Sequence, residues 1–323
     1  MFARPSLAKR YPLRALAAGA RWLMNPVSEG GAKQVPRMLL YATGVETFAA
    51  VQQMRTHPTG RRVLADRPDL SAVLSSPSVL AAMPAGSLGR AFHESVNIPG
   101  GVPGYLLAGL IYRDGFFDRY EMPDDARYVI ERSRWLHDLF HVLTGYGTDL
   151  AGEGLLIYFD LGYRQSVSYS VAAMTPMGLG PGIFLRPHVG RRRWRDLLRE
   201  AHARGRAAQE TMPATYVYWE ELLPRPLDEV RAELGIVPFA EDTRDWLSKS
   251  PLGRRAASGF GAYARQAEQA QLARRIVESG VDVRDLMRLP PARAAELRRL
   301  VAEGADQATV RSRAAHLIAE ARA

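Results

Sequence analysis

Residues 126–143 read ARYVIERSRWLHDLFHVL, and this stretch decides both the expected fold and the expected site. It contains neither glycine nor proline, and apolar residues such as Trp135 and Phe140 recur in it with the spacing of a helix. On a helix, His137 and His141 are four residues apart and project from one face. The stretch therefore predicts a helix that presents two imidazoles on the same side.

Two carboxylates accompany these imidazoles. Asp138 is three residues from His141 and can lean toward the same site. The run Gly145–Asp149 breaks the helix, so the chain can turn there and bring Glu153 back from the next element. Two imidazoles and two carboxylates make a neutral site around a divalent cation, and imidazole suits zinc and iron. We therefore expect one divalent metal bound by His137, Asp138, His141 and Glu153, with zinc as the first choice and iron as the alternative.

Spacing alone leaves other interpretations open. His137 can pack in a core without any metal, while Asp138 hydrogen-bonds a neighbour. The zinc-peptidase motif carries Glu at the second position because that carboxylate must reach a metal-bound water, and the Asp found here disfavours a metallohydrolase. A His-Asp phosphohydrolase would need an upstream histidine and a downstream aspartate, and nothing around His93 or Asp160 supports that assignment.

The wider sequence resembles a known family. The order His-Asp-x-x-His, eleven residues, then Glu is similar to the signature of the fourth coenzyme Q (ubiquinone) biosynthesis protein family. Further segments that resemble the family are Pro84–Gly89, Met122–Trp135, Tyr218–Glu221 and Pro226–Ile236, so the resemblance runs over about residues 61–239. One departure is Ile157–Asp160, where the family often has a Lys-x-Phe-Glu run.

The resemblance implies a role in ubiquinone biosynthesis. The implied activity is that of a metal-dependent lyase, an oxidative decarboxylase acting at ring carbon 1 of a prenylated benzoate precursor, with Asp138 and Glu153 as catalytic residues. The implied partners are this prenylated quinone precursor and other ubiquinone biosynthesis proteins, whose complex the chain would organise. A non-catalytic scaffold that binds prenyl lipids around a structural metal is the alternative.

An uncharged segment, Gln165–Leu185, follows the expected site. Its glycines and prolines within Thr175–Gly182 would break a helix inside hydrocarbon, so it does not predict a membrane span. We expect it to form an apolar wall for a prenyl chain, beside a helix over Gly154–Ala172. The expected substrate contacts are Arg134, Tyr158, Tyr163, Met174 and Met177, for which core packing or a dimer interface is the alternative.

Composition points to an anionic partner. The 323 residues carry a net charge of +9 and include no cysteine, which excludes disulfides and thiolate metal sites. Met1–Pro26 contains five basic and no acidic residues, and Arg191–Ala208 is also rich in arginine, so both are candidates for contact with an anionic membrane surface. We expect a cytoplasmic protein, peripheral on the inner face of a membrane, with homodimer formation left open. Nucleic acid is not an expected partner, because aromatic residues are scarce after Tyr263.

The pattern of the whole chain predicts an all-α protein, because alternating strand patterns between turn signals are absent. We expect a multi-helix domain with a small helical C-terminal extension. The expected parts are a basic N-terminal helical segment (1–60), a metal-binding helical domain of the ubiquinone-biosynthesis type (61–239) and an Ala/Arg-rich helical extension (240–323). In the extension, Leu297, Leu300 and Val301 should face the interior of a small bundle.

Overall fold

Helices form the regular structure of this chain, as its sequence predicts. The computed structural model describes residues 5–7, 9–24, 34–74, 76–96, 119–163, 189–243, 246, 249, 251, 254, 269, 272, 275–277, 279–282, 285–286 and 289–322. Across these residues there is no β-strand, only two isolated bridges that join Ser6 to Glu121 and Ser87 to Pro226. None of the described helices combines the length and the apolar character that crossing a membrane requires.

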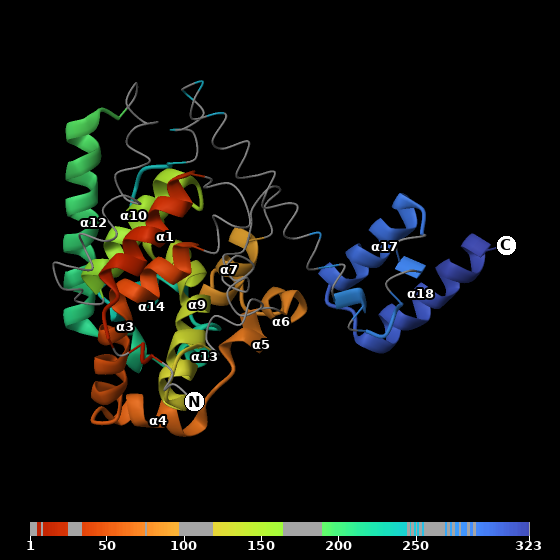
Figure 1. The fold of residues 1–323 in the computed structure, drawn as a ribbon, viewed down its shortest axis with the longest axis horizontal. Helices are drawn as coiled ribbons and strands as arrows, with labels where there is room; N and C mark the ends of the chain where they lie inside the picture. The colour runs from red at the N-terminus through yellow and green to blue at the C-terminus, as the bar shows by residue number, and fades with distance from the viewer. Residues whose placement is uncertain are drawn as a thin grey trace.

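The helices follow one another with short connections in most of the described part. They are α1 (Pro12–Met24), α3 (Gln34–Met54), α4 (Pro58–Asp66), α5 (Leu70–Leu74), α6 (Pro77–Ala81), α7 (Leu88–Val96), α9 (Asp124–Thr144), α10 (Leu150–Tyr163), α12 (Arg191–Thr211), the 3₁₀ helix η2 (Ala214–Tyr216), α13 (Trp219–Leu222), α14 (Leu227–Glu233), α17 (Pro291–Ala302) and α18 (Gln307–Arg322). Figure 1 shows α12 along one side of the main body, and α17 and α18 apart from it.

The main core lies between α9, α10 and α12; leucine is its most frequent residue, and it contains a group of packed aromatic side chains. Phe140 of α9 packs against Phe159 and Tyr163 of α10 and against Trp219, with ring centroids 5.2–5.9 Å apart. Trp194 of α12 is 2% exposed and belongs to the same core. Tilted and edge-on ring pairs of this kind add to the stabilisation that burial alone provides.

A pair of glycines brings α10 and α12 into close contact. A Cβ atom added at Gly162 would lie 2.1 Å from the carbonyl oxygen of His202, and one added at Gly205 would lie 2.0 Å from that of Phe159. Glycine in a helix costs about 1 kcal/mol relative to alanine, and here it allows the two backbones to touch. Gly162 in this predicted helix therefore serves helix packing.

The C-terminal helices α17 and α18 have a hydrophobic core of their own. Leu297 and Val301 of α17 are 0% and 2% exposed and pack with Val310 and Leu317 of α18. Leu300 packs against the same cluster while partly exposed, so the expected inward-facing set is confirmed. The boundaries expected for the three parts of the chain stay a prediction.

Candidate metal centre

Helix α9 positions the two histidines, and its C-terminal end is firmly anchored. Gly145 ends the helix in the left-handed conformation (φ 73°), and its N–H donates to the carbonyl of His141 at 3.0 Å. Two further carbonyls of the last turn, those of Leu143 and Val142, accept hydrogen bonds from the guanidinium of Arg231 at 3.0 and 2.9 Å. The end of the helix that carries His141 is thus held by contacts within the protein.

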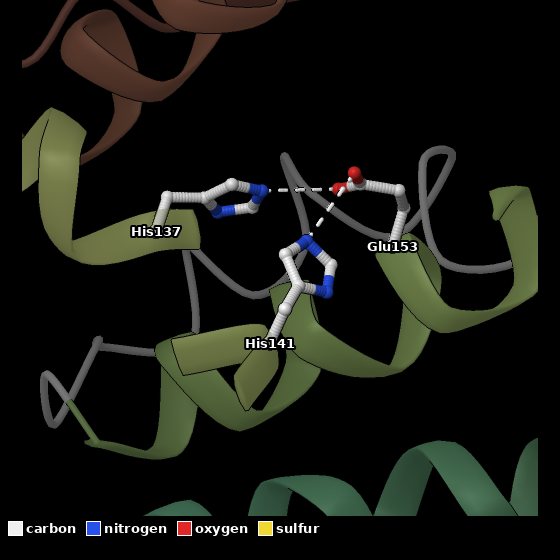
Figure 2. Close-up of side chains that lie close together, drawn as sticks. All are labelled: His137, His141 and Glu153. Atoms are coloured by element: carbon white, nitrogen blue, oxygen red, sulfur yellow. Dashed lines mark hydrogen bonds and ion pairs between the residues drawn. The ribbon is translucent and has the colours of Figure 1, made fainter. Parts of the chain in front are cut away.

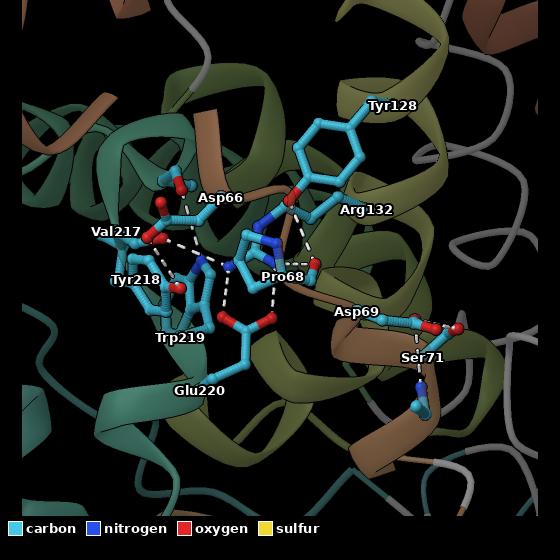
Figure 3. A network of polar contacts seen from close by, with 12 residues as sticks. Asp66, Pro68, Asp69, Ser71, Tyr128, Arg132, Val217, Tyr218, Trp219 and Glu220 are labelled. Atoms are coloured by element: carbon cyan, nitrogen blue, oxygen red, sulfur yellow. Dashed lines mark hydrogen bonds and ion pairs between the residues drawn. The ribbon is translucent and has the colours of Figure 1, made fainter. Parts of the chain in front are cut away.

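Farther back along α9, a buried ion pair holds the helix to two other segments (Figure 3). Arg132 donates to both carboxylate oxygens of Glu220, at 2.6 and 2.7 Å, and its side chain is only 6% exposed. It also donates to the carbonyls of Pro68 and Val217 at 3.2 and 3.5 Å, and the hydroxyl of Tyr128 donates to Pro68 at 3.1 Å. The two-point geometry fixes the rotation of α9 as well as its position.

Helix α10 positions the carboxylate of Glu153. Oδ1 of Asp149 accepts hydrogen bonds from the backbone N–H groups of Ala151 (2.8 Å) and Gly152 (3.3 Å), which caps the helix N-terminus. The other oxygen of Asp149 accepts a hydrogen bond of 2.5 Å from the hydroxyl of Thr243, which is 1% exposed. Glu153 lies in the first turn after this cap, so the cap sets where its carboxylate points.

The side chains of His137, His141 and Glu153 converge (Figure 2). Oε2 of Glu153 lies 3.1 Å from Nε2 of His137, and Oε1 lies 3.3 Å from Nε2 of His141. One ligand atom from each residue lies within 4.8 Å of the other two, which is a spacing that can hold a metal ion. The predicted helix, the turn after it and the return of Glu153 are all confirmed.

The state of His141 fits a metal ligand. Its Nδ1 donates to the carbonyl of Tyr146 at 3.0 Å, which leaves Nε2 as the nitrogen that faces Glu153. That Nε2 is buried and has no hydrogen bond of good geometry, although Glu153 is near it. A buried imidazole nitrogen aimed at a carboxylate and at a second imidazole fits a bound divalent cation.

Charge within the cluster shifts two pKa values in opposite directions. Burial would lower the pKa of His137, but the carboxylate of Glu153 outweighs burial and raises the pKa of His137 to about 9. Burial would raise the pKa of Glu153, but the charges of His141 and His137 hold the pKa of Glu153 well below its ordinary range. In the metal-free protein, a proton on His137 therefore supplies the positive charge that a bound metal would otherwise supply.

Asp138 lies beside the cluster and not in it. Its side chain is buried, 7% exposed, and its charge is among the causes that raise the pKa of His137. The three convergent ligand atoms come from His137, His141 and Glu153 alone. A direct bond from Asp138 to a metal stays a prediction.

The other expected site residues are placed as follows. Tyr163 is buried in the aromatic core, and its hydroxyl donates to the carbonyl of Met212 at 2.5 Å. Tyr158 is half-buried and packs near Ile157 and Leu161. The side chain of Arg134 and the whole of Met174 and Met177, like the segment Gln165–Leu185, lie outside the described residues.

Sequence reasoning missed two groups that support the site. Neither the Arg132–Glu220 pair nor the Asp149–Thr243 contact was expected, and each joins residues about 90 positions apart. Glu220 stands in a segment that resembles the family named above, but no local pattern in the sequence indicates its partner.

Comparisons with known proteins agree with the resemblance. The family model described as "Coenzyme Q (ubiquinone) biosynthesis protein Coq4" matches residues 34–103 and 118–240. A mitochondrial ubiquinone biosynthesis protein coq4 of Talaromyces stipitatus is 34% identical over 183 residues, 57% of this chain and 58% of that protein. Its counterpart in Botryotinia fuckeliana is 33% identical over 183 residues, 57% of this chain and 59% of that protein. The matched part of the chain thus spans less than two thirds of the length of these relatives.

A solved structure is also similar. It is a chain from Nostoc punctiforme PCC 73102, described as a candidate ubiquinone biosynthesis protein, with a TM-score of 0.48 and 19% sequence identity. The similarity covers 70% of this chain and 99% of that chain.

Proposed function

The chain belongs to the Coq4 family of coenzyme Q (ubiquinone) biosynthesis proteins, and on that premise we propose that it acts in ubiquinone biosynthesis through a divalent metal held by His137, His141 and Glu153. The observation that carries this proposal is the convergence of three ligand atoms within 4.8 Å. The buried Nε2 of His141, which lacks a hydrogen bond, supports it further.

The donor set favours a functional metal over a purely structural one. Structural zinc sites are usually closed by four protein ligands, whereas catalytic sites keep a position for water or substrate. With Asp138 beside the cluster, the protein supplies two imidazoles and one carboxylate, which leaves coordination positions open. The same donor set is typical of mononuclear iron enzymes that use dioxygen.

The reaction that we assign is oxidative decarboxylation of a prenylated 4-hydroxybenzoate-type precursor. The bond between ring carbon 1 and the carboxyl carbon breaks, carbon dioxide leaves, and a hydroxyl takes its place on the ring. One oxygen atom of dioxygen enters the product, and a two-electron donor with two protons reduces the other atom to water. When bound, the metal would supply positive charge for the substrate carboxylate and, if it is iron, a centre for electron transfer.

Residues of this chain would provide the surroundings for that step. Leu155 and Leu156 follow Glu153 along α10 and are 0% and 1% exposed, so the helix that carries Glu153 has an apolar, buried side. Exclusion of water strengthens the electrostatic interactions on which carboxylate binding depends. Asp138, buried next to His137, would carry a proton, and Arg134 would contact the substrate carboxylate.

Metal identity follows from this assignment. Zinc has no redox chemistry and can act only as a Lewis acid. An oxidative step at the metal therefore requires a redox-active metal such as iron, whereas loss of carbon dioxide without oxidation is compatible with zinc. We take iron as the metal that accords with oxidative decarboxylation and zinc as the metal that accords with a scaffold or a non-oxidative lyase.

The test combines metal analysis with product analysis. Protein purified without chelator should contain close to one iron per chain, and His141→Ala should lose most of it because that variant removes the buried imidazole. His316→Ala is the matched control, since His316 is 59% exposed on α18 and should leave the metal content unchanged.

Cells that lack the chain should then be supplied with the prenylated precursor and complemented with variants. The wild-type chain and Glu200→Gln, a control on the exposed face of α12, should restore the decarboxylated and hydroxylated product, and Glu153→Gln should not. Equal product in all strains, including the one without the chain, would refute the enzymatic assignment and favour a prenyl-lipid scaffold that organises other ubiquinone biosynthesis proteins.

A further inference from the structure

Helix α1 packs on the protein through one face that consists of small residues. Ala15 and Ala18 are 0% and 1% exposed and contact Met38 of α3, and a Cβ added at Gly19 would lie 3.2 Å from the sulfur of Met38. The same cluster includes Ile157 and Leu161 of α10, the helix that carries Glu153. Figure 1 shows α1 lying across this part of the main body. Its position is thus fixed by close packing.

The opposite face of α1 exposes large apolar side chains. Leu13 is 80% exposed, Leu16 is 61% exposed and Met24 is 77% exposed. Leu13 and Met24 are the most exposed large apolar residues in the described part of the chain. With Ala20, which is also exposed, they are spaced by three or four residues and form one continuous stripe along the helix. We call Leu13, Leu16, Ala20 and Met24 the outer stripe.

Basic side chains flank the outer stripe, and no acidic residue occurs in residues 1–24. Lys9, Arg10, Arg14 and Arg21 are all exposed, and Arg10 pairs with Glu46 at 3.2 Å. Arg14 is held in place, since it donates to the hydroxyl of Tyr120 at 2.8 Å and lies over the ring of Tyr11 at 4.8 Å. A fixed helix with an apolar stripe and basic flanks has the composition of a helix that lies in a membrane interface.

Helix α12, the other arginine-rich candidate, has a different surface. Its large apolar residues Trp194, Leu197 and Leu198 are buried in the core. Several of its arginines pair with acidic groups, as Arg199 does with Asp196 at 3.0 Å and Arg204 does with Glu200. Without an apolar stripe and with its charges partly neutralised, α12 has the character of a solvated helix.

We propose that the outer stripe of α1 with its basic flanks is a docking surface for an anionic phospholipid bilayer. The apolar side chains would enter the boundary between headgroups and acyl chains, while the basic side chains would meet lipid phosphates. A second copy of the chain fits this surface less well, because it would bring two sets of basic flanks together. The surface precedes residue 34, where the family match begins, and the proposal does not depend on the metal chemistry.

The first test measures binding of the full-length protein to vesicles. Vesicles of phosphatidylcholine with 30% phosphatidylglycerol should sediment the protein at 50 mM salt, and vesicles of phosphatidylcholine alone should sediment much less. Binding should weaken as salt is raised, because charge attraction is screened over about 10 Å at 0.1 M. The double variant Leu13→Gln/Leu16→Gln should bind at least tenfold more weakly, and it preserves helix propensity. Val237→Gln, at an apolar residue that is 66% exposed and lies outside α1, should bind like the wild type.

A second measurement locates the contact without altering the stripe's large residues. The chain has no cysteine, so Ala20→Cys and Ala203→Cys give single labelling sites on α1 and α12, both at exposed positions. An environment-sensitive label should shift to shorter wavelength on anionic vesicles at residue 20 and not at residue 203. A shift at residue 203 alone, or undiminished binding of Leu13→Gln/Leu16→Gln, would overturn the proposal. The proposal would also be overturned if the wild type forms a dimer that the double variant dissociates, and if the wild type does not bind vesicles.

Discussion

Removing one partner of the buried Arg132–Glu220 pair should strongly destabilise the protein. In Glu220→Gln the side chain keeps its shape, but the guanidinium of Arg132, 6% exposed, loses its counter-charge and one of its two carboxylate acceptors, and it retains the amide oxygen of the new side chain and the carbonyls of Pro68 and Val217. Breaking a buried pair in this way costs about 3–5 kcal/mol, and the 16% exposure of Glu220 places the expected loss near the lower limit, at about 3 kcal/mol. For a body of this size that corresponds to a fall in melting temperature of roughly 6–12 °C.

The assay is differential scanning calorimetry with a matched control and a double variant. Glu233 forms an ion pair with Arg225 on the surface, where their side chains are 47% and 38% exposed, respectively. Glu233→Gln removes this carboxylate and should cost less than about 1 kcal/mol. Arg132→Met/Glu220→Leu removes both buried charges and should recover most of the loss, because no unpaired charge remains. If Glu220→Gln costs no more than Glu233→Gln, or if the double variant is less stable than Glu220→Gln, the reasoning about α9 is wrong.

Three further predictions concern packing, pH and metal. Gly162→Ala should force α10 and α12 apart, since the new Cβ would lie 2.1 Å from a backbone oxygen of α12, and the melting temperature should fall by several degrees. Asp125→Asn should lower the free energy of unfolding at pH 7 by less than about 1 kcal/mol. Hydrogen bonds from Arg55 and Arg67 hold the pKa of Asp125 below its usual value, so the stabilisation by this carboxylate is present above about pH 4 and is lost as pH falls through the lowered pKa. Unfolding titrations should therefore show that the difference between Asp125→Asn and the wild type disappears in acid. Adding a divalent metal at 100 times its dissociation constant should stabilise the chelator-treated protein by about 2.7 kcal/mol, an increment that calorimetry should no longer detect in Glu153→Gln.

The part of the site that the sequence predicts is the part that depends on local rules. The spacing of His137 and His141 places them on one face of any helix, and Gly145 ends that helix because glycine readily adopts positive φ. The return of Glu153 follows from the short turn. These three facts require only neighbouring residues, so the two imidazoles and one carboxylate can be derived before any tertiary structure is known.

The remaining features depend on contacts between distant segments. The helix period places Asp138 about 100° from His137. At that angle Asp138 could bind the metal or lie beside the metal site, and only the packing of α9 against its neighbours shows that Asp138 lies next to the cluster. Tyr163 was expected to contact substrate because it lies on an apolar helix face, but the same pattern describes its position in the aromatic core. Gly162 likewise needed Gly205, 43 residues away, to be understood as a packing residue.

The way in which the ligands are held bears on whether the metal has a structural or a functional role. A structural metal replaces missing contacts, and proteins that depend on one unfold without it. Here each ligand-bearing helix is anchored by protein contacts alone: Arg231 holds the end of α9, Asp149 and Thr243 cap α10, and the glycine contact joins α10 to α12. The three ligand atoms are therefore brought within 4.8 Å by the fold itself, and His141 is left with a buried nitrogen that nothing in the described structure hydrogen-bonds. Ligands that are held by protein contacts, together with such a nitrogen, support the proposal that the metal serves chemistry.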